Sequence, residues 1–122
     1  MKTTVFLVGA GPGDPGLITV KGEKLLKIAD VIVYDYLSNP IFLNKANNNC
    51  KLINAGKRLG FKAMSQAQIN KKLVSLAKQK YKNIVRLKGG DPLLFGRGGE
   101  EAEYLKKNKI NFEIVPGITS AI

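Results

Sequence analysis

NIVRLKGGDPLLFGRGGEE, residues 83–101, joins a short apolar run to a turn that is rich in glycine. Residues 83–87 are typical of a buried strand, because the run is short and mainly apolar. The glycines that follow let the backbone pass close to a ligand in conformations that a side chain would forbid. Ligands of open α/β sheets bind beyond the carboxyl ends of the strands, so we predict a ligand-binding loop here.

The same kind of apolar run occurs five times, separated by helical segments. The runs are continuous, as expected when helices cover both faces of a sheet, and their alternation with helices indicates parallel strands. We therefore predict an α/β fold with a five-stranded, mainly parallel sheet and helices on both faces. The expected strands are residues 4–8, 31–34, 51–55, 83–87 and 112–115.

Three helices are expected between these strands. Ser65 and Gln68 have the spacing of a capping box, which predicts that a helix begins there. The residues that follow on one face of this helix are Ile69, Leu73, Leu76 and Lys80. The first helix is expected at residues 20–29. The last is expected to start at residues 97–99, with acidic residues leading and lysines closing it, as the helix dipole favours.

Composition narrows the class of protein. The chain has 122 residues, enough for one core, and a formal net charge of +11. A single cysteine, Cys50, and the absence of histidine cannot supply the usual zinc ligands, so we expect no metal. Apolar runs are shorter than the roughly 18 residues of a spanning helix and the start lacks a secretory cleavage site. We therefore expect a cytoplasmic protein without a membrane partner.

The basic residues are spread along the chain, and aromatic residues do not alternate with them as in a platform that binds single strands. We therefore expect no nucleic-acid partner, although a module that binds RNA or another polyanion stays an alternative. A substrate with many carboxylates would also use this charge.

The turn at residues 9–15 contains Pro12 and Asp14 and lacks the third glycine of a dinucleotide fingerprint. A proline without an N–H and an added carboxylate favour a neutral or cationic ligand over a phosphate. Asp35, at the end of the second strand, either caps the segment that starts near Ser38 or acts as a base or ligand. Lys57 and Arg58 follow the third strand, where two adjacent cations suit carboxylate groups.

Placement links these residues, because each lies just beyond the end of a different predicted strand. That set is Pro12, Asp35, Lys57, Asp91 and Thr119. The carboxyl ends of parallel strands meet at one edge of the sheet, so we expect a single site there.

Six segments carry a resemblance to a known family. They are residues 8–15 (VGAGPGDP), 29–35 (ADVIVYD), 56–58 (GKR), 85–92 (VRLKGGDP), 95–101 (FGRGGEE) and 115–121 (VPGITSA). Through them the whole chain resembles the tetrapyrrole methylase family, and within it the enzymes that methylate uroporphyrinogen III. The resemblance implies methyl transfer from S-adenosylmethionine to two ring carbons, which gives precorrin-2 for sirohaem and cobalamin. It also implies the strand order 3-2-4-1-5.

The resemblance also implies roles for single residues. Asp35 and Lys57 would be the acid–base candidates. The residues that would contact S-adenosylmethionine are Pro12, Gly89, Gly90, Asp91, Leu94, Thr119 and Ser120. To these we add Arg58 and Arg97 as candidates for binding the carboxylates of the substrate.

Family enzymes have a second α/β domain that completes the adenosine pocket. The resemblance therefore implies that residues 1–122 are an N-terminal domain, inactive alone, of an enzyme that is a homodimer when complete. Lys62 and Tyr36 stand where many members have a histidine and an arginine, which affects how the substrate is held. Two alternatives stay open: a nicotinamide-dependent oxidoreductase domain, and another tetrapyrrole methylase such as a cobalt-precorrin methyltransferase.

Overall fold

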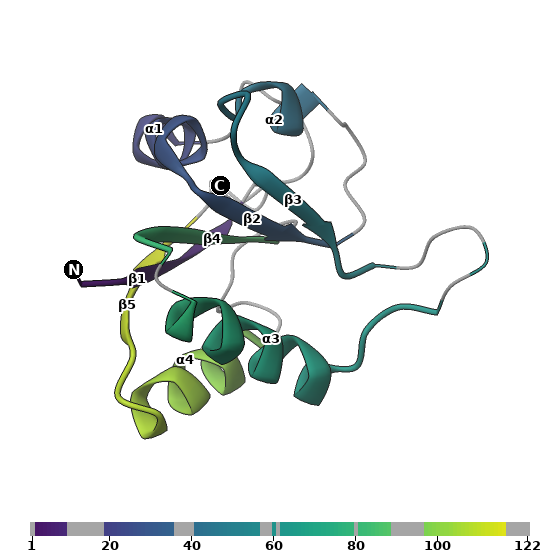
Figure 1. The fold of residues 1–122 in the computed structure, drawn as a ribbon, viewed down its shortest axis with the longest axis vertical. Helices are drawn as coiled ribbons and strands as arrows, with labels where there is room; N and C mark the ends of the chain where they lie inside the picture. Colours follow the sequence, from purple (N-terminus) through teal and green to yellow (C-terminus); the bar gives the residue numbers. More distant parts are fainter. Residues whose placement is uncertain are drawn as a thin grey trace, which may run out of the picture.

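The computed structural model of the chain describes residues 2–9, 19–35, 41–56, 60, 62–79, 81–88 and 97–116, with the backbone alone at residues 41, 42, 97 and 98. Strands and helices alternate along it (Figure 1). They are β1 (Thr4–Gly9), α1 (Val20–Ile28), β2 (Val31–Tyr34), α2 (Ile41–Asn44), β3 (Lys51–Asn54), α3 (Gln66–Lys78), β4 (Asn83–Lys88), α4 (Arg97–Lys107) and β5 (Asn111–Val115).

The five strands form one sheet in the order β3-β2-β4-β1-β5, with every neighbouring pair parallel. This confirms the predicted fold class and the strand order that the resemblance implied. Asp30 ties the starts of two strands together, because its Oδ2 accepts the backbone N–H groups of Lys82 and Asn83 at 3.0 and 2.8 Å. The strand order makes β4 the central strand, between β2 and β1.

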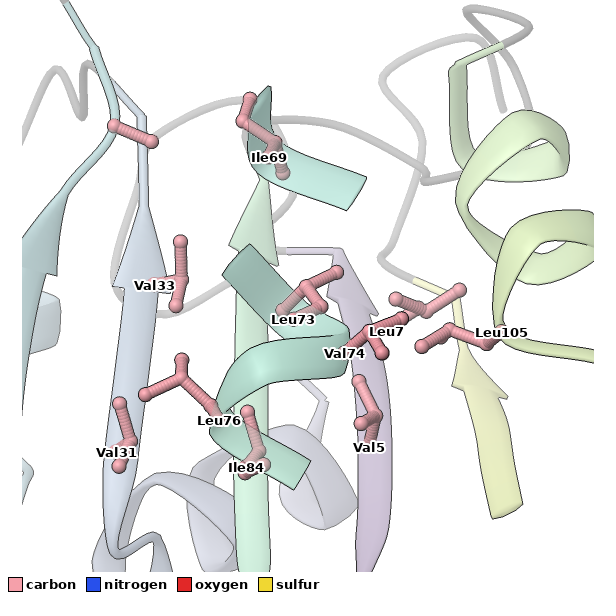
Figure 2. Close-up of a cluster of buried hydrophobic side chains, with 11 residues drawn as sticks. Val5, Leu7, Val31, Val33, Ile69, Leu73, Val74, Leu76, Ile84 and Leu105 are labelled. Atoms are coloured by element: carbon pink, nitrogen blue, oxygen red, sulfur yellow. The ribbon is translucent and has the colours of Figure 1, made fainter. Parts of the chain in front are cut away.

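Side chains alternate between the two faces of each strand, which divides the core into two layers. On one face, Val31 and Val33 of β2 and Ile84 of β4 lie beside α3, in a cluster that also contains Leu105 of α4, as Figure 2 shows. Leu73 of α3 lies at the centre of this layer and is fully buried. Helices α3 and α4 thus cover the face of the sheet on which Ile84 lies. Arg86 and Lys88 follow Ile84 at alternate positions of β4 and point to the same face.

The opposite face is covered by α1 and α2 (Figure 1). Ile32, Val85 and Leu87 of the sheet pack there against Leu25 and Leu26 of α1. Both faces are therefore covered, as the continuous apolar strands predicted. Within the described ranges, no helix is both long enough and apolar enough to cross a membrane.

The helices largely follow the sequence pattern. Ser65 caps α3 through the predicted capping box, in which its hydroxyl accepts the Gln68 N–H and the Gln68 side chain bonds back to the Ser65 N–H. α3 ends at Lys78, and Lys80 lies outside the described residues. Helix α2 was not predicted, because four residues are too few to show a helical period.

Candidate active site

The carboxyl ends of the parallel strands lie at one edge of the sheet. Gly9 at the end of β1 pairs with Lys88 at the end of β4, and Tyr34 at the end of β2 pairs with Leu87. Asp35 follows Tyr34 directly, so it leaves β2 at the level of Lys88. Two neighbouring strands, β1 and β4, thus end directly before the two stretches that are richest in glycine.

Of the predicted site residues, the structure describes the side chain of Asp35. Arg97 begins α4, where the backbone alone is described. Lys62 is exposed and Tyr36 is not described. The remaining predicted residues lie outside the described ranges: Pro12, Lys57, Arg58, Gly89, Gly90, Asp91, Leu94, Thr119 and Ser120.

Asp35 is held by Arg86, which lies on β4. The Nη2 of Arg86 donates to Asp35 Oδ2 at 3.1 Å, and Nη1 donates to Oδ1, so the guanidinium contacts both carboxylate oxygens. Such two-point pairing fixes the plane of a carboxylate as well as its position. Since 39% of the Asp35 side chain remains exposed, its carboxylate is fixed and still open to solvent.

Glu101 of α4 holds Arg86 from the other side. Its Oε2 accepts Arg86 Nε at 2.9 Å and the side-chain amide of Gln66, at the start of α3, at 3.1 Å. Glu101 is 0% exposed and Arg86 is 1% exposed. Glu101 is one of the acidic residues that were expected to lead the last helix and favour its dipole. That interpretation was incomplete, because Glu101 is also the buried partner of a strand arginine.

Lys88 completes a group of two cations and two carboxylates. Its Nζ lies 3.6 Å from Glu101 Oε1, and within the described part of the chain it makes no hydrogen bond. Burial lowers the pKa of Lys88, and the neighbouring Glu101 charge offsets this only in part. Burial also acts to lower the pKa of Arg86, but Asp35 and Glu101 outweigh it, so that the pKa is raised and Arg86 stays charged.

The sequence contains the signal for this cluster, although it was not recognised. Arg86 and Lys88 occupy alternate positions of an otherwise apolar strand, so both side chains point to the same face. Charged residues are almost never fully buried unless they are paired. A buried arginine on a central strand therefore required acidic partners, which Asp35 and Glu101 supply.

The arrangement offers proton-accepting and cation-binding chemistry. An ionised carboxylate has about four lone-pair sites, and Arg86 uses two of those of Asp35. The remaining lone-pair sites of the Asp35 carboxylate can accept a proton or face a positive charge. No group of three or more possible metal ligands occurs among the residues that the structure describes.

Comparisons with known proteins identify the family of the chain. The model of the tetrapyrrole (corrin/porphyrin) methylases matches residues 4–122. A uroporphyrinogen-III C-methyltransferase of Methanocaldococcus jannaschii is 57% identical over 122 residues, which are 100% of this chain and 50% of that protein. An S-adenosyl-L-methionine-dependent uroporphyrinogen III methyltransferase of Methanosarcina barkeri is 55% identical over 118 residues, which are 97% of this chain and 46% of that protein.

A solved structure is similar as well. The uroporphyrin-III C-methyltransferase of Thermus thermophilus complexed with S-adenosylhomocysteine superimposes with a TM-score of 0.80 at 43% identity, covering 96% of this chain and 46% of that one. The chain thus spans about half the length of the proteins that it matches.

Proposed function

Because the chain belongs to the tetrapyrrole methylase family, we propose that it forms the N-terminal domain of an S-adenosylmethionine-dependent enzyme that methylates uroporphyrinogen III. The product would be precorrin-2, on the route to sirohaem and cobalamin. The matched relatives are about twice as long, since the chain covers 50% and 46% of them. We therefore expect a second domain to complete the cofactor pocket and the isolated chain to be inactive.

The observation that carries this proposal is the Asp35 carboxylate, which is fixed by Arg86 yet 39% exposed at the carboxyl edge of the sheet. S-adenosylmethionine supplies a methyl group on a sulfonium sulfur. As a ring carbon of the substrate bonds to this methyl group, the electron pair of the broken bond returns to sulfur, and the substrate ring becomes cationic. The methylated carbon already carries a side arm and has no proton to give, so the cationic ring system loses a proton from another of its atoms, and Asp35 accepts that proton.

The other residues are assigned around Asp35. Lys57 is the second acid–base candidate, and Arg58 and Arg97 bind carboxylates of the substrate. The cofactor is held by residues in the segments that follow β1, β4 and β5, namely Pro12, Gly89, Gly90, Asp91, Leu94, Thr119 and Ser120. The pairing of Gly9 with Lys88 supports this assignment, because it starts two of these segments from adjacent strands.

The cofactor assignment is tested on the chain itself by NMR titration with S-adenosylhomocysteine and, in parallel, NAD. We expect shifts with S-adenosylhomocysteine that cluster at Pro12, Gly90, Asp91 and Thr119, and an Asp91→Ala variant that weakens them. Shifts with NAD alone would instead favour an oxidoreductase domain. An exposed-site variant, Glu103→Gln, serves as the matched control because Glu103 is an exposed acid on α4.

Catalysis is tested in a chimaera in which this chain replaces the matching 122 residues of the M. jannaschii relative. We expect conversion of uroporphyrinogen III to precorrin-2. Asp35→Asn should lower kcat by about 10²- to 10⁴-fold, the usual contribution of a general base, with unchanged affinity for S-adenosylhomocysteine. Turnover of a cobalt-precorrin in place of uroporphyrinogen III would assign the chain to another member of the family.

We further infer that the complete protein is a cytoplasmic homodimer with no nucleic-acid or membrane partner. The dimer rests on the family resemblance, the point on nucleic acid on the distribution of charge along the chain, and the points on membrane and cytoplasm on the shortness of the apolar runs. Sedimentation of the chimaera checks the dimer, because a monomer with full activity would contradict it.

A further inference from the structure

We propose that Arg86, oriented by Glu101, is a positioning residue that holds the Asp35 carboxylate in place for proton removal. This inference rests on the proposed function, in which Asp35 is the base. It adds a residue pair that lies behind the site and does not touch the reacting atoms.

The first argument is the use of the guanidinium donors. Arg86 Nε is committed to Glu101, while Nη1 and Nη2 each donate to one oxygen of Asp35. Nη1 also lies 3.5 Å from the backbone oxygen of Val33 and 3.3 Å from that of Leu87. Because acceptors surround the planar guanidinium of Arg86 on three sides, it has one orientation. Its two contacts with Asp35 therefore fix the orientation of the carboxylate as well.

The second argument is the gradient of exposure along the chain of charges. Glu101 is 0% exposed, Arg86 is 1% exposed and Asp35 is 39% exposed. The network therefore has a buried end on α4 and a solvent-facing end at the edge of the sheet. Buried ion pairs are often no more stabilising than apolar residues of the same volume, so fold stability alone does not explain a pair at this place.

The third argument is rigidity. Arg86 belongs to β4, which is hydrogen-bonded on both sides, to β2 and to β1. Glu101 is additionally held by Gln66 at the start of α3. The Asp35 carboxylate is thus connected through Arg86 to the central strand, and through Glu101 and Gln66 to α4 and α3. These contacts fix the carboxylate although the backbone of Asp35 lies just past the end of β2.

The test uses three variants. Arg86→Lys keeps the charge, but a single ammonium cannot reach both oxygens of Asp35 and Oε2 of Glu101 together. Glu101→Gln keeps volume and an acceptor oxygen, and is the second variant, compared with Arg86→Lys at the same folded fraction by far-UV circular dichroism. Lys45→Met is the matched control, because it breaks the 2.7 Å ion pair with Glu23 on the opposite face of the sheet.

In the chimaera, Arg86→Lys should lower kcat by about 10- to 100-fold, the size expected for a catalytic group misplaced by about 1 Å. The KM for S-adenosylmethionine should stay within about twofold, since binding groups lie elsewhere. Glu101→Gln should act in the same direction and Lys45→Met should leave both constants unchanged. Wild-type kcat in both Arg86→Lys and Glu101→Gln would overturn the proposal.

A second readout needs no activity. Three-bond NMR couplings in the chain should show a single χ1 rotamer of Asp35 in the wild type and rotamer averaging in Arg86→Lys, at unchanged far-UV circular dichroism. A single rotamer in both would overturn the positioning role even if the chimaera were inactive. Wild-type turnover by Asp35→Asn would instead remove the proposed base, and the positioning role with it.

Discussion

Replacing Glu101 by glutamine should destabilise the chain strongly, although the two side chains have nearly the same shape. Glu101 is 0% exposed and stands between two buried cations, with Arg86 Nε at 2.9 Å and Lys88 Nζ at 3.6 Å. Removing one partner of a buried ion pair costs about 3–5 kcal/mol, because a charge is left uncompensated. Glutamine keeps an acceptor oxygen for Arg86, so we expect a loss of about 3 kcal/mol, at the lower end of this range.

Urea unfolding followed by far-UV circular dichroism measures this loss, since the chain has no tryptophan. The same substitution is made at Glu103, an exposed residue on the same helix, where we expect a change within about 0.5 kcal/mol. In a Lys88→Met background the Glu101→Gln loss should shrink by about 1 kcal/mol or more, because one of the two stranded cations is gone.

Two results would refute this reasoning. A loss below about 1 kcal/mol for Glu101→Gln would mean that the buried charge is not needed to balance Arg86 and Lys88. A loss that grows in the Lys88→Met background would mean that Lys88 and Glu101 do not interact favourably.

Three further outcomes follow from single contacts. Burial lowers the pKa of Lys88 in the folded chain below its ordinary value of 10.5. Between that lowered pKa and 10.5, Lys88 is protonated in the unfolded chain and neutral in the folded one, so the free energy of unfolding rises with pH. Lys88→Met should remove this rise. Comparison of urea midpoints of the two proteins across this range checks it. Leu73→Ala, at 0% exposure, should cost about 2–5 kcal/mol by the same assay; a loss near zero would place Leu73 outside the core. Ser65→Ala should cost about 1 kcal/mol through loss of the cap on Gln68 N–H, and Ser65→Thr, which keeps the hydroxyl, should restore most of it.

The fold was predictable because its signals are local. Each strand is a short apolar run, and the capping box at Ser65 and Gln68 needs only four consecutive residues. Four strand boundaries shifted by one residue: β1 continues to Gly9, β3 ends at Asn54, β4 continues to Lys88 and β5 begins at Asn111. The shifts of β4 and β5 add a polar residue at a strand end, where backbone pairing with the neighbour outweighs side-chain preference. Helix α2 escaped prediction because it is a single turn.

The site was predictable only in part. Asp35 was chosen as a candidate from its place after the second strand, and in the structure it follows β2 at the carboxyl edge of the sheet. Its partner was not identified. The sequence left a helix cap, a base or a ligand-binding group as alternatives for Asp35, whereas in the structure both of its carboxylate oxygens accept from Arg86, 51 residues away along the chain.

The sequence by itself determined which segments form the five strands and the three longer helices, which face of α3 is apolar, and, through its motifs, the family. The tertiary structure alone decided that Asp35, Arg86 and Glu101 meet. Their contact depends on β2 lying beside β4 in the register that pairs Tyr34 with Leu87, and on α4 covering the same face. Local sequence patterns report hydrophobicity and backbone preference over a few residues, whereas a buried charge finds its partner only when the whole sheet is assembled.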